Sequence, residues 1–237
     1  MEFELSIIIP SYNEMKTIPH VLKKINSLSF ASRTEVIVVD DGSDDGTYDY
    51  LSSISDNFSY KLFVLRHSEN LGKGAALRTA ISYSNGKYLI IQDADLEYDP
   101  QNIELIYEKL VKSGCDVVFG SRLINPNKIY NKLYLFGNKF ITFLINFLFG
   151  SNYTDAYTCY KAFKKNVASS LNLFSKGFEV EAEIASKIAL KKYGMMGIGI
   201  VYVPRSREEG KKIDFCDFVK GVFTVLKIKF LSFMGKI

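Results

Sequence analysis

At 237 residues the chain can form one large domain, or one domain with an extension, and can bury a sizeable core. Its hydrophobic content of 47% and charged content of 24% exclude a disordered chain. A net charge of +4, without a long block of like charge, argues against a nucleic-acid-binding protein.

The cysteine pattern and the amino terminus bear on the compartment. Cys115, Cys159 and Cys216 are widely spaced and show neither zinc-ligand nor redox pairing, so we expect reduced thiols in a cytoplasmic protein. The chain begins Met1-Glu2-Phe3-Glu4 and enters a strand directly, so we expect no secretory signal. No apolar run reaches the roughly 18 residues of a membrane-spanning helix.

Apolar runs and turn-forming residues alternate along the first half of the chain. They predict strands at residues 5–9, 35–39, 62–65, 88–91 and 117–120, and a further strand at residues 198–203. Apolar residues at helical spacing predict helices that begin near Ile18, Ala75 and Pro100. Because strands and helices alternate, we expect an α/β fold, with a mostly parallel sheet flanked by helices.

Polar residues gather where three of the predicted strands end, at Pro10–Glu14, Asp40–Thr47 and Asp93–Glu97. Open α/β sheets bind ligands at this edge. Alternate side chains of an extended chain share a face, so we expect Asp93, Asp95 and Glu97 to point the same way. Converging carboxylates repel one another unless a cation lies between them, and hard oxygen ligands suit Mg²⁺ or Mn²⁺. Each segment alone also fits an ordinary turn.

Two common nucleotide-binding motifs are missing from the sequence. It contains no Gly-x-Gly-x-x-Gly after the first strand and no Walker-type Gly-Lys-Ser/Thr. Gly72-Lys73-Gly74 precedes a predicted helix, where backbone amides or the Lys73 ammonium could bind an anion. The same residues also fit a simple glycine-rich start of a helix.

Four blocks occur in a characteristic order: Pro10-Ser11-Tyr12-Asn13-Glu14, then Asp40-Asp41-Gly42-Ser43 with Asp45-Gly46-Thr47, then Gly72-Lys73-Gly74-Ala75, then Asp93-Ala94-Asp95. In this order they resemble family 2 glycosyltransferases, inverting enzymes with a nucleotide-sugar-binding α/β fold called GT-A. Later blocks, among them Gly120-Ser121-Arg122, Cys159-Tyr160-Lys161 and Gly177–Glu183, resemble the dolichyl- or polyprenyl-phosphate hexose synthase branch. The resemblance covers roughly residues 4 to 227.

The resemblance implies roles for individual residues. A UDP- or GDP-linked sugar would be bound by Pro10, Tyr12, Glu14, Asp40, Asp41, Lys73, Asp93, Ala94 and Arg122. A Mg²⁺ or Mn²⁺ ion on the diphosphate would be held by Asp93, Asp95 and Glu97. The acceptor phosphate would lie near Arg122, Arg205, Arg207 and Lys211, with Asp95, Arg122, Arg205 and Lys211 as the catalytic residues. Two positions depart from the family pattern: Glu97 stands where relatives often carry Gln, and Cys159 where many carry Gly.

A basic cluster, Arg205–Lys212, follows the last predicted strand. Guanidinium groups clamp phosphate oxygens and lysine adds point charge, so this cluster can bind phosphate. It could equally be a solvated loop that is neutralised by its own Glu208 and Glu209.

Two aromatic segments with flanking lysines stand out in the second half, residues 130–149 and 215–233. The first could be a buried helix or a helix partly embedded at a membrane interface. The second has the composition of a basic amphipathic helix on an anionic membrane, although it could pack on the catalytic domain or on a partner. We expect a glycosyltransferase domain at 1–212 and a membrane-associating helix at 213–237.

These features predict an inverting, metal-dependent transfer of a hexose from a nucleotide diphosphate sugar to polyprenyl phosphate. We expect a peripheral or monotopic protein on the cytoplasmic face of the membrane, and the sequence leaves a homo-oligomer open. A phosphate acceptor is already ionised near neutral pH and needs no strong base. A hydroxyl acceptor would need one, for which Glu179, Glu181 and Glu183 are candidates, unless they are glutamates on a helix surface.

Two other functions remain open. One is transfer of a sugar to a hydroxyl of a lipid-linked or surface saccharide, and the other is a non-enzymatic, membrane-associated protein that binds nucleotide sugars. The chain has no Trp, so it cannot contain the Gln-x-x-Arg-Trp motif of processive polysaccharide synthases.

Overall fold

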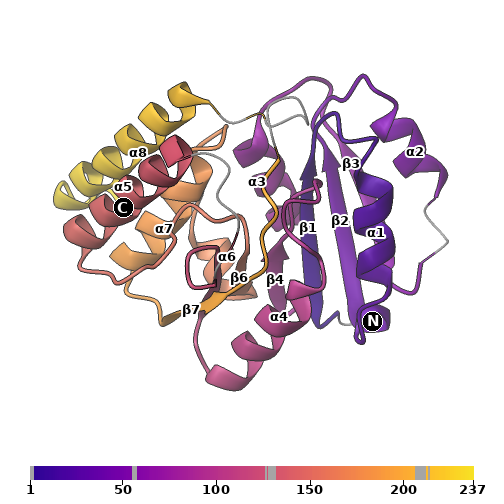
Figure 1. Cartoon of the computed structure of the whole chain (residues 1–237), viewed down its shortest axis with the longest axis horizontal. Coiled ribbons are helices and arrows are strands. Elements are labelled where there is room, and N and C mark those ends of the chain that lie inside the picture. The colour runs from indigo at the N-terminus through magenta and orange to yellow at the C-terminus, as the bar shows by residue number, and fades with distance from the viewer. Residues whose placement is uncertain (1–2, 55–57, 126, 128–131, 206–211, 213) are drawn as a thin grey trace.

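The apolar runs of the first half form the centre of a mixed sheet. The computed structural model describes residues 3–54, 58–125, 127, 132–205, 212 and 214–237, and within these it has seven strands in the order β3-β2-β1-β4-β6-β5-β7 (Figure 1). The strands are β1 (Leu5–Ser11), β2 (Thr34–Asp40), β3 (Lys61–Arg66), β4 (Tyr88–Ile91), β5 (Val117–Ser121), β6 (Lys161–Lys164) and β7 (Met195–Gly199). Neighbouring strands are parallel except where β6 pairs with β4 and β5.

This arrangement confirms the predicted α/β fold and its mostly parallel sheet. Two details differ from the sequence expectation. The antiparallel strand β6 was not predicted, and the last strand lies at Met195–Gly199 rather than at residues 198–203. Beyond β7, Tyr202 makes only an isolated antiparallel bridge to Tyr98.

The central strands are covered on both faces. Consecutive residues of β1 and β2 have no exposed surface, as at Ile7, Ile8 and Ile9. Because neighbouring side chains of a strand point to opposite faces, both faces must be packed, as is usual for parallel strands. In the register of the sheet, Ser11 pairs with Asp40 and Ile8 with Ile91, so β1, β2 and β4 end close together.

The helices are α1 (Ile18–Asn26), α2 (Thr47–Ser53), α3 (Lys73–Tyr83), α4 (Asn102–Ser113), α5 (Lys132–Phe149), α6 (Lys165–Ser170), α7 (Val180–Leu190) and α8 (Phe215–Phe233), with a short 3₁₀ turn at Ala31–Arg33. Helix α1 buries Ile18, Val21, Leu22 and Ile25, which recur at the spacing of one helical face. Helix α3 packs on β1 and β2 through small residues such as Ala76 and Ala80, which have no exposed surface.

Helices α5, α7 and α8 pack together at the end of the molecule away from α1 and β3 (Figure 1). Two glycines allow α5 and α8 to approach closely. A Cβ atom on Gly137 would lie 3.2 Å from the ring of Phe218, and one on Gly221 would lie 3.1 Å from Cδ1 of Ile141. A capping box between Asp214 and Asp217 fixes the start of α8.

Helix α5 has a buried face and an exposed face, so the buried-helix alternative holds for one face and contact of the other with a membrane stays a prediction. Ile141 and Ile145 are buried in the core, whereas Phe143 is 64% exposed and Phe147 is 74% exposed. No helix in the described ranges is both long enough and apolar enough to cross a membrane.

Candidate active site

A cavity of about 990 Å³ opens where β1, β2 and β4 end. Its polar wall includes Pro10, Tyr12, Glu14, Asp41, Lys73, Asp93, Ala94, Asp95, Glu97, Arg122 and Arg205. Its apolar wall comes from the first half of α5 and the first turn of α8, with Leu133, Leu135, Phe136, Ile141, Phe215 and Phe218. One cavity therefore joins a highly charged end to a hydrophobic end.

The carboxylates of Asp93 and Asp95 lie on the polar wall, each paired with a cation. Asp93 Oδ1 is 2.7 Å from Lys73 Nζ, and Asp95 Oδ2 is 2.7 Å from Arg205 Nη2. Ala94 between them is buried on the same wall. The expected pair of carboxylates at the end of β4 is thus present and faces the cavity.

Glu97 does not join that pair. Its carboxylate accepts hydrogen bonds from Tyr202 Oη at 2.5 Å and from the Arg205 amide at 3.0 Å, so it holds the segment at residues 202–205 instead. The backbone supports the same connection, because Val203 N donates to Glu97 O at 2.9 Å. The expected convergence of three carboxylates therefore does not extend to Glu97 in this structure.

The surroundings of the two aspartates shift their pKa values in opposite directions. Burial, together with the charges of Asp93 and Glu97, raises the pKa of Asp95 to about 7, although Arg205 opposes this shift. Burial also disfavours ionisation of Asp93, but the ammonium of Lys73 outweighs it and holds the pKa of Asp93 below its ordinary value. A further cation beside Asp95 would stabilise its ionised form.

The donor set at this wall suits a hard divalent cation. Across the described ranges, no group of three His, Cys, Asp or Glu side chains is arranged to hold a metal ion. Asp93 and Asp95 nevertheless offer carboxylate oxygens to one cavity, and Mg²⁺ commonly takes one or two protein carboxylates and completes its shell with phosphate oxygens and water. The residues therefore fit a Mg²⁺ or Mn²⁺ ion that is bound together with a diphosphate.

Arg205 lies among three carboxylates. Besides Asp95, its guanidinium contacts Glu14 at 3.3 Å and approaches Glu97 at 3.8 Å. Lys212 also pairs with Glu14, at 2.8 Å. The structure thus brings Arg205 into the site, as the sequence predicted. Its guanidinium contacts acidic residues there, and its predicted contact with the acceptor phosphate stays a prediction. Arg207 and Lys211 lie outside the described residues, and their predicted phosphate contacts stay predictions.

Arg122 lies on the cavity wall in a fixed orientation. Its Nε and Nη2 bind both oxygens of Asp155, at 2.8 and 2.9 Å, and Nη2 also donates to the carbonyl of Tyr157. The guanidinium carbon is 5.3 Å from the centre of the Tyr202 ring. Asp155 is 1% exposed and accepts a further hydrogen bond from Asn138 of α5, so Arg122 is held from two sides.

The two aspartates at the end of β2 have different surroundings. Asp41 lines the cavity, while its oxygens accept hydrogen bonds from the amides of Leu71 and Gly72 and lie 2.6 Å from His67 Nδ1. Asp40 has no exposed surface and interacts with the Ser43 amide and with Arg66. Of the two predicted nucleoside contacts, only Asp41 reaches the cavity. His67 was not predicted and has no motif that marks it.

Two amides at the amino terminus of α3 are already paired within the protein. Gly74 N and Ala75 N both donate to the carbonyl of Lys176, at 2.6 and 3.2 Å. A Cβ atom on Gly72 would lie 2.4 Å from that carbonyl oxygen, so glycine is needed here for close packing. Lys73 instead presents its ammonium, which bridges Asp93 and Glu181.

Two of the three glutamates of the α7 region are buried, and Glu179 is partly buried. Glu181 is 3% exposed, and its carboxylate contacts Lys73 at 2.9 Å and also pairs with the fully buried Lys161. Glu183 has no exposed surface and pairs with Lys187, and Glu179 accepts from the amides of Lys176 and Gly177. The interpretation as helix-surface glutamates is wrong for Glu181 and Glu183, because buried lysines compensate their charge.

Comparisons with known proteins agree with this geometry. The family model "Glycosyl transferase family 2" matches residues 6–171. A UDP-N-acetylglucosamine–dolichyl-phosphate N-acetylglucosaminyltransferase of Methanococcus voltae is 30% identical over 87% of this chain and 89% of its own length. A dolichol-phosphate mannosyltransferase of Pyrococcus furiosus is 27% identical over 88% of this chain, which spans 59% of that protein.

Among solved structures, glucosyl-3-phosphoglycerate synthase from Mycobacterium tuberculosis, in complex with Mn²⁺, UDP and glucosyl-3-phosphoglycerate, has the same fold. It superposes with a TM-score of 0.69 at 18% identity, covering 95% of this chain and 80% of that one. The family match spans most of the chain, and its residues include the strand ends that line the cavity. This chain belongs to glycosyl transferase family 2 and is a glycosyltransferase of the hexosyltransferase class with a GT-A-like fold.

Proposed function

We propose that this enzyme transfers a hexose from a nucleotide diphosphate sugar to polyprenyl phosphate at the cytoplasmic surface of a membrane. The observation that supports this proposal best is the form of the cavity, in which an acidic and basic end continues into an apolar end made by α5 and α8. A polyprenyl phosphate has the matching form, a charged head on a hydrocarbon chain. The relatives named for transfer to dolichyl phosphate point to the same class of acceptor.

The polar wall would bind the donor. Pro10, Tyr12 and Asp41 would contact the nucleoside, and Asp93 and Asp95 would hold Mg²⁺ or Mn²⁺. The ion would supply Lewis-acid stabilisation of the leaving diphosphate. Lys73 already shares its ammonium between Asp93 and Glu181, so it is positioned to contact a diphosphate oxygen beside Asp93.

Arginines would orient the acceptor. Arg122 is fixed by Asp155, and Arg205 is held near Asp95, so their guanidinium groups border the same cavity. Such fixed cations can hold an ionised phosphate in line with the anomeric carbon. No strong base is required. Glu181, the predicted base that lines the cavity, already forms ion pairs with Lys73 and Lys161, so its carboxylate oxygens are engaged within the protein.

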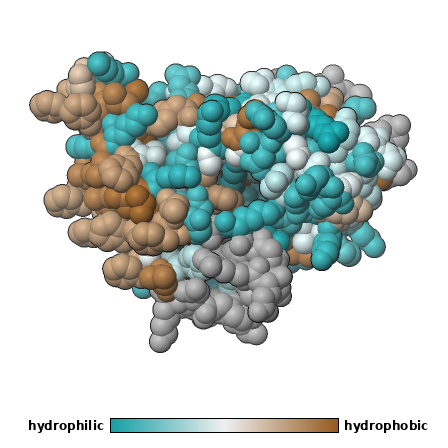
Figure 2. Space-filling model, turned by 90° about the horizontal axis from the view of Figure 1, so that it is seen from above, coloured by the Kyte–Doolittle hydropathy of each residue, from teal (hydrophilic) through white to brown (hydrophobic). Residues whose placement is uncertain are grey.

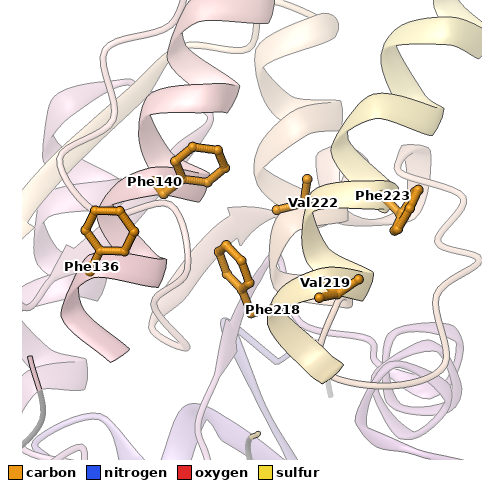
Figure 3. A pocket seen from close by; sticks show the side chains of 6 residues that line it. All are labelled: Phe136, Phe140, Phe218, Val219, Val222 and Phe223. Atoms are coloured by element: carbon orange, nitrogen blue, oxygen red, sulfur yellow. The ribbon is translucent and has the colours of Figure 1, made fainter. Parts of the chain in front are cut away.

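Exposed aromatic residues would bring the cavity to the membrane. Figure 2 shows hydrophobic surface gathered at the left edge, where Figure 1 has α5 and α8. Six phenylalanines of these two helices are exposed, Phe136, Phe143, Phe147, Phe223, Phe230 and Phe233, and Figure 3 shows Phe136 on α5 and Phe223 on α8. Lysines on the same two helices, among them Lys139, Lys220, Lys227 and Lys229, suit an anionic bilayer. The protein would lie on the bilayer without spanning it.

The donor half of the proposal is tested by thermal unfolding with UDP or GDP, each with and without Mn²⁺. One nucleotide should raise the unfolding temperature only in the presence of the metal, because a ligand that binds the folded state stabilises it. Asp95→Asn should abolish the metal-dependent rise. Glu108→Gln, an exposed carboxylate on α4, is the matched control and should keep it.

The acceptor half is tested by offering polyprenyl phosphate and a lipid-linked saccharide in parallel with the nucleotide sugar. Transfer to the phosphate, lost in Asp95→Asn, is the expected result. Transfer to the saccharide alone would overturn the acceptor assignment and favour a hydroxyl as the attacking group.

A further inference from the structure

His67 lies directly behind the part of the cavity wall that Asp41 forms. It follows β3, and its backbone amide donates to Asp40 O at 2.8 Å. Its imidazole Nδ1 is 2.6 Å from Oδ1 of Asp41, which lines the cavity. The side chain of His67 is 12% exposed and that of Asp41 is 4% exposed. A mostly buried histidine therefore supports a carboxylate that faces the cavity.

Both ring nitrogens of His67 have partners. An ionised carboxylate only accepts hydrogen bonds, so Nδ1–H donates to Asp41. The other nitrogen, Nε2, lies 3.0 Å from the hydroxyl oxygen of Thr79 on α3. The imidazole is thus held between α3 and the end of β2, and it cannot turn away from Asp41 without losing both contacts.

A backbone loop supports the same carboxylate. The amide of Leu71 donates to Asp41 Oδ1 at 3.0 Å, and the amide of Gly72 donates to Oδ2 at 2.7 Å. Gly42, which follows Asp41, allows this loop to come close, because a Cβ atom on it would lie 2.6 Å from the carbonyl carbon of Glu69. Three donors therefore fix one carboxylate.

These donors are shared unequally between the two oxygens of Asp41. An ionised carboxylate has about four acceptor positions, two on each oxygen. Oδ1 accepts from His67 and from the Leu71 amide, so its two positions are taken. Among the described residues, Oδ2 accepts only from the Gly72 amide. Asp41 can therefore accept one further hydrogen bond, on Oδ2, from a ligand in the cavity.

The nucleobases differ in the number of donors that they would offer to this carboxylate. Uracil has one, N3–H. Guanine has two adjacent donors, N1–H and the exocyclic amino group, which match both oxygens of an unengaged carboxylate. With Oδ1 occupied, one of the guanine donors would be left without a partner, and a buried donor without a partner weakens binding.

We propose that His67 is a positioning residue that occupies Oδ1 of Asp41 and thereby makes the site select uridine over guanosine diphosphate sugars. The inference rests on the proposed function, in which Asp41 contacts the nucleoside, and it makes the donor specific. His67 acts through Asp41 and does not touch the nucleotide itself.

Calorimetric titration of the parent protein tests the count of donors directly. UDP, GDP and 3-methyluridine diphosphate are compared in the presence of Mn²⁺. UDP should bind at least about 10-fold more tightly than either of the others, because GDP leaves a donor unpaired and the methyl group removes N3–H. This comparison needs no variant, so it does not depend on how a substitution folds.

Two variants of His67 test its role. His67→Phe frees Oδ1 of Asp41 and should reduce the preference for UDP over GDP at least about 5-fold. His67→Asn keeps an N–H donor at a similar distance from the backbone and should restore most of the preference. The matched control is His20→Phe, at the other histidine of the chain, which is exposed on α1 and should bind both nucleotides as the parent does.

The outcomes separate this inference from the proposed function. Metal-dependent binding of GDP that is as tight as that of UDP would overturn the inference and leave the proposed transfer standing. An equal loss of affinity for both nucleotides in His67→Phe would overturn it as well, because it would mean that His67 only supports the fold. Binding of neither nucleotide in the presence of Mn²⁺ would contradict the proposed function itself.

Discussion

Buried ion pairs decide which charged side chains can act in the cavity. Asp93, Lys73, Glu181 and Lys161 form a chain of alternating charges from the cavity wall into the core. Lys161 has no exposed surface. A charge that is removed from water in this way is tolerated only while its partners remain. Glu181 therefore depends on Lys161, and the position of Lys73 depends on Glu181.

Replacing Lys161 by Met should lower the free energy of unfolding by about 3–5 kcal/mol, because the charge of Glu181 loses a partner inside the protein. The double variant Lys161→Met, Glu181→Met should be less destabilised than the sum of the two single variants, since it removes both charges. Urea denaturation of the four proteins measures this difference. The control is Lys164→Met, which breaks a half-exposed ion pair with Asp116 and should lower the free energy of unfolding by only about 0–1 kcal/mol. Equal costs for Lys161→Met and Lys164→Met would contradict the argument.

The Arg122–Asp155 pair makes stability depend on pH. Burial disfavours the ionised Asp155, but Arg122 and several hydrogen bonds outweigh burial and hold its pKa below the ordinary value. A carboxyl group with a lowered pKa in the folded state stabilises the protein above its unfolded pKa of about 3.9, and this contribution is lost as the pH falls through the folded pKa.

Asp155→Asn should therefore lower the free energy of unfolding by about 3–5 kcal/mol at pH 7, because it leaves Arg122 without its buried partner. The difference between the parent and Asp155→Asn should shrink when the pH is lowered from 7 to 3. Chemical denaturation at several pH values measures it. Asp116→Asn, on the partly exposed pair with Lys164, is the control and should change stability little at any pH. A cost for Asp155→Asn that is constant over this range would show that the ionised form is not what stabilises the fold.

At the scale of elements, close contact between α5 and α8 depends on glycine. Gly221 lies in the middle of α8, where a Cβ atom would come within 3.1 Å of Ile141 and 3.2 Å of Tyr157 Oη. Glycine is a poor helix former, so its presence here indicates that the space is needed by the neighbouring elements. Gly137 of α5 likewise leaves room for the ring of Phe218, which lines the apolar end of the cavity.

Gly221→Leu should destabilise the protein by about 1–3 kcal/mol, because the added side chain must displace Ile141 and Tyr157. It should also weaken binding of isoprenyl phosphates by separating α5 from α8. Lys220→Leu, the exposed neighbour on α8, should change stability by less than about 0.5 kcal/mol. Thermal unfolding of the two variants makes the comparison. Stabilisation by Gly221→Leu would mean that helix propensity outweighs the lack of space.

The elements differ in how well the sequence could predict them. Strands β1, β2 and β4 follow from uninterrupted apolar runs, and their acidic ends were expected at one edge because parallel strands end together. Strand β6 begins with Lys161, a residue that argues against a buried strand unless its partner Glu181 is known. The partners of Asp93 and Asp95 were also beyond prediction, because Lys73 and Arg205 reach them from distant parts of the chain.

At the scale of the molecule, charge and hydrophobicity are separated. The nucleotide-binding motifs surround the polar end of the cavity, whereas α5 and α8 carry most of the exposed aromatic residues. Exposed apolar patches of this kind mark interaction surfaces. The proposed boundary between residues 212 and 213 stays a prediction, since α8 packs against both α5 and α7.

Binding to lipid vesicles should depend on both the aromatic and the basic residues of this surface. Burying a phenylalanine side chain in a bilayer contributes about 1.5–3 kcal/mol, and each lysine near an anionic surface contributes about 1 kcal/mol. The double variant Phe147→Ser, Phe230→Ser should therefore bind anionic vesicles at least about 100-fold more weakly. Leu105→Ser, an exposed apolar residue on α4, is the matched control and should bind as the parent does. Co-sedimentation at low and high salt measures both contributions, and high salt should weaken binding of the parent because it screens the lysines. Binding that is equally strong in the double variant, or that is unaffected by salt, would contradict the proposed membrane surface.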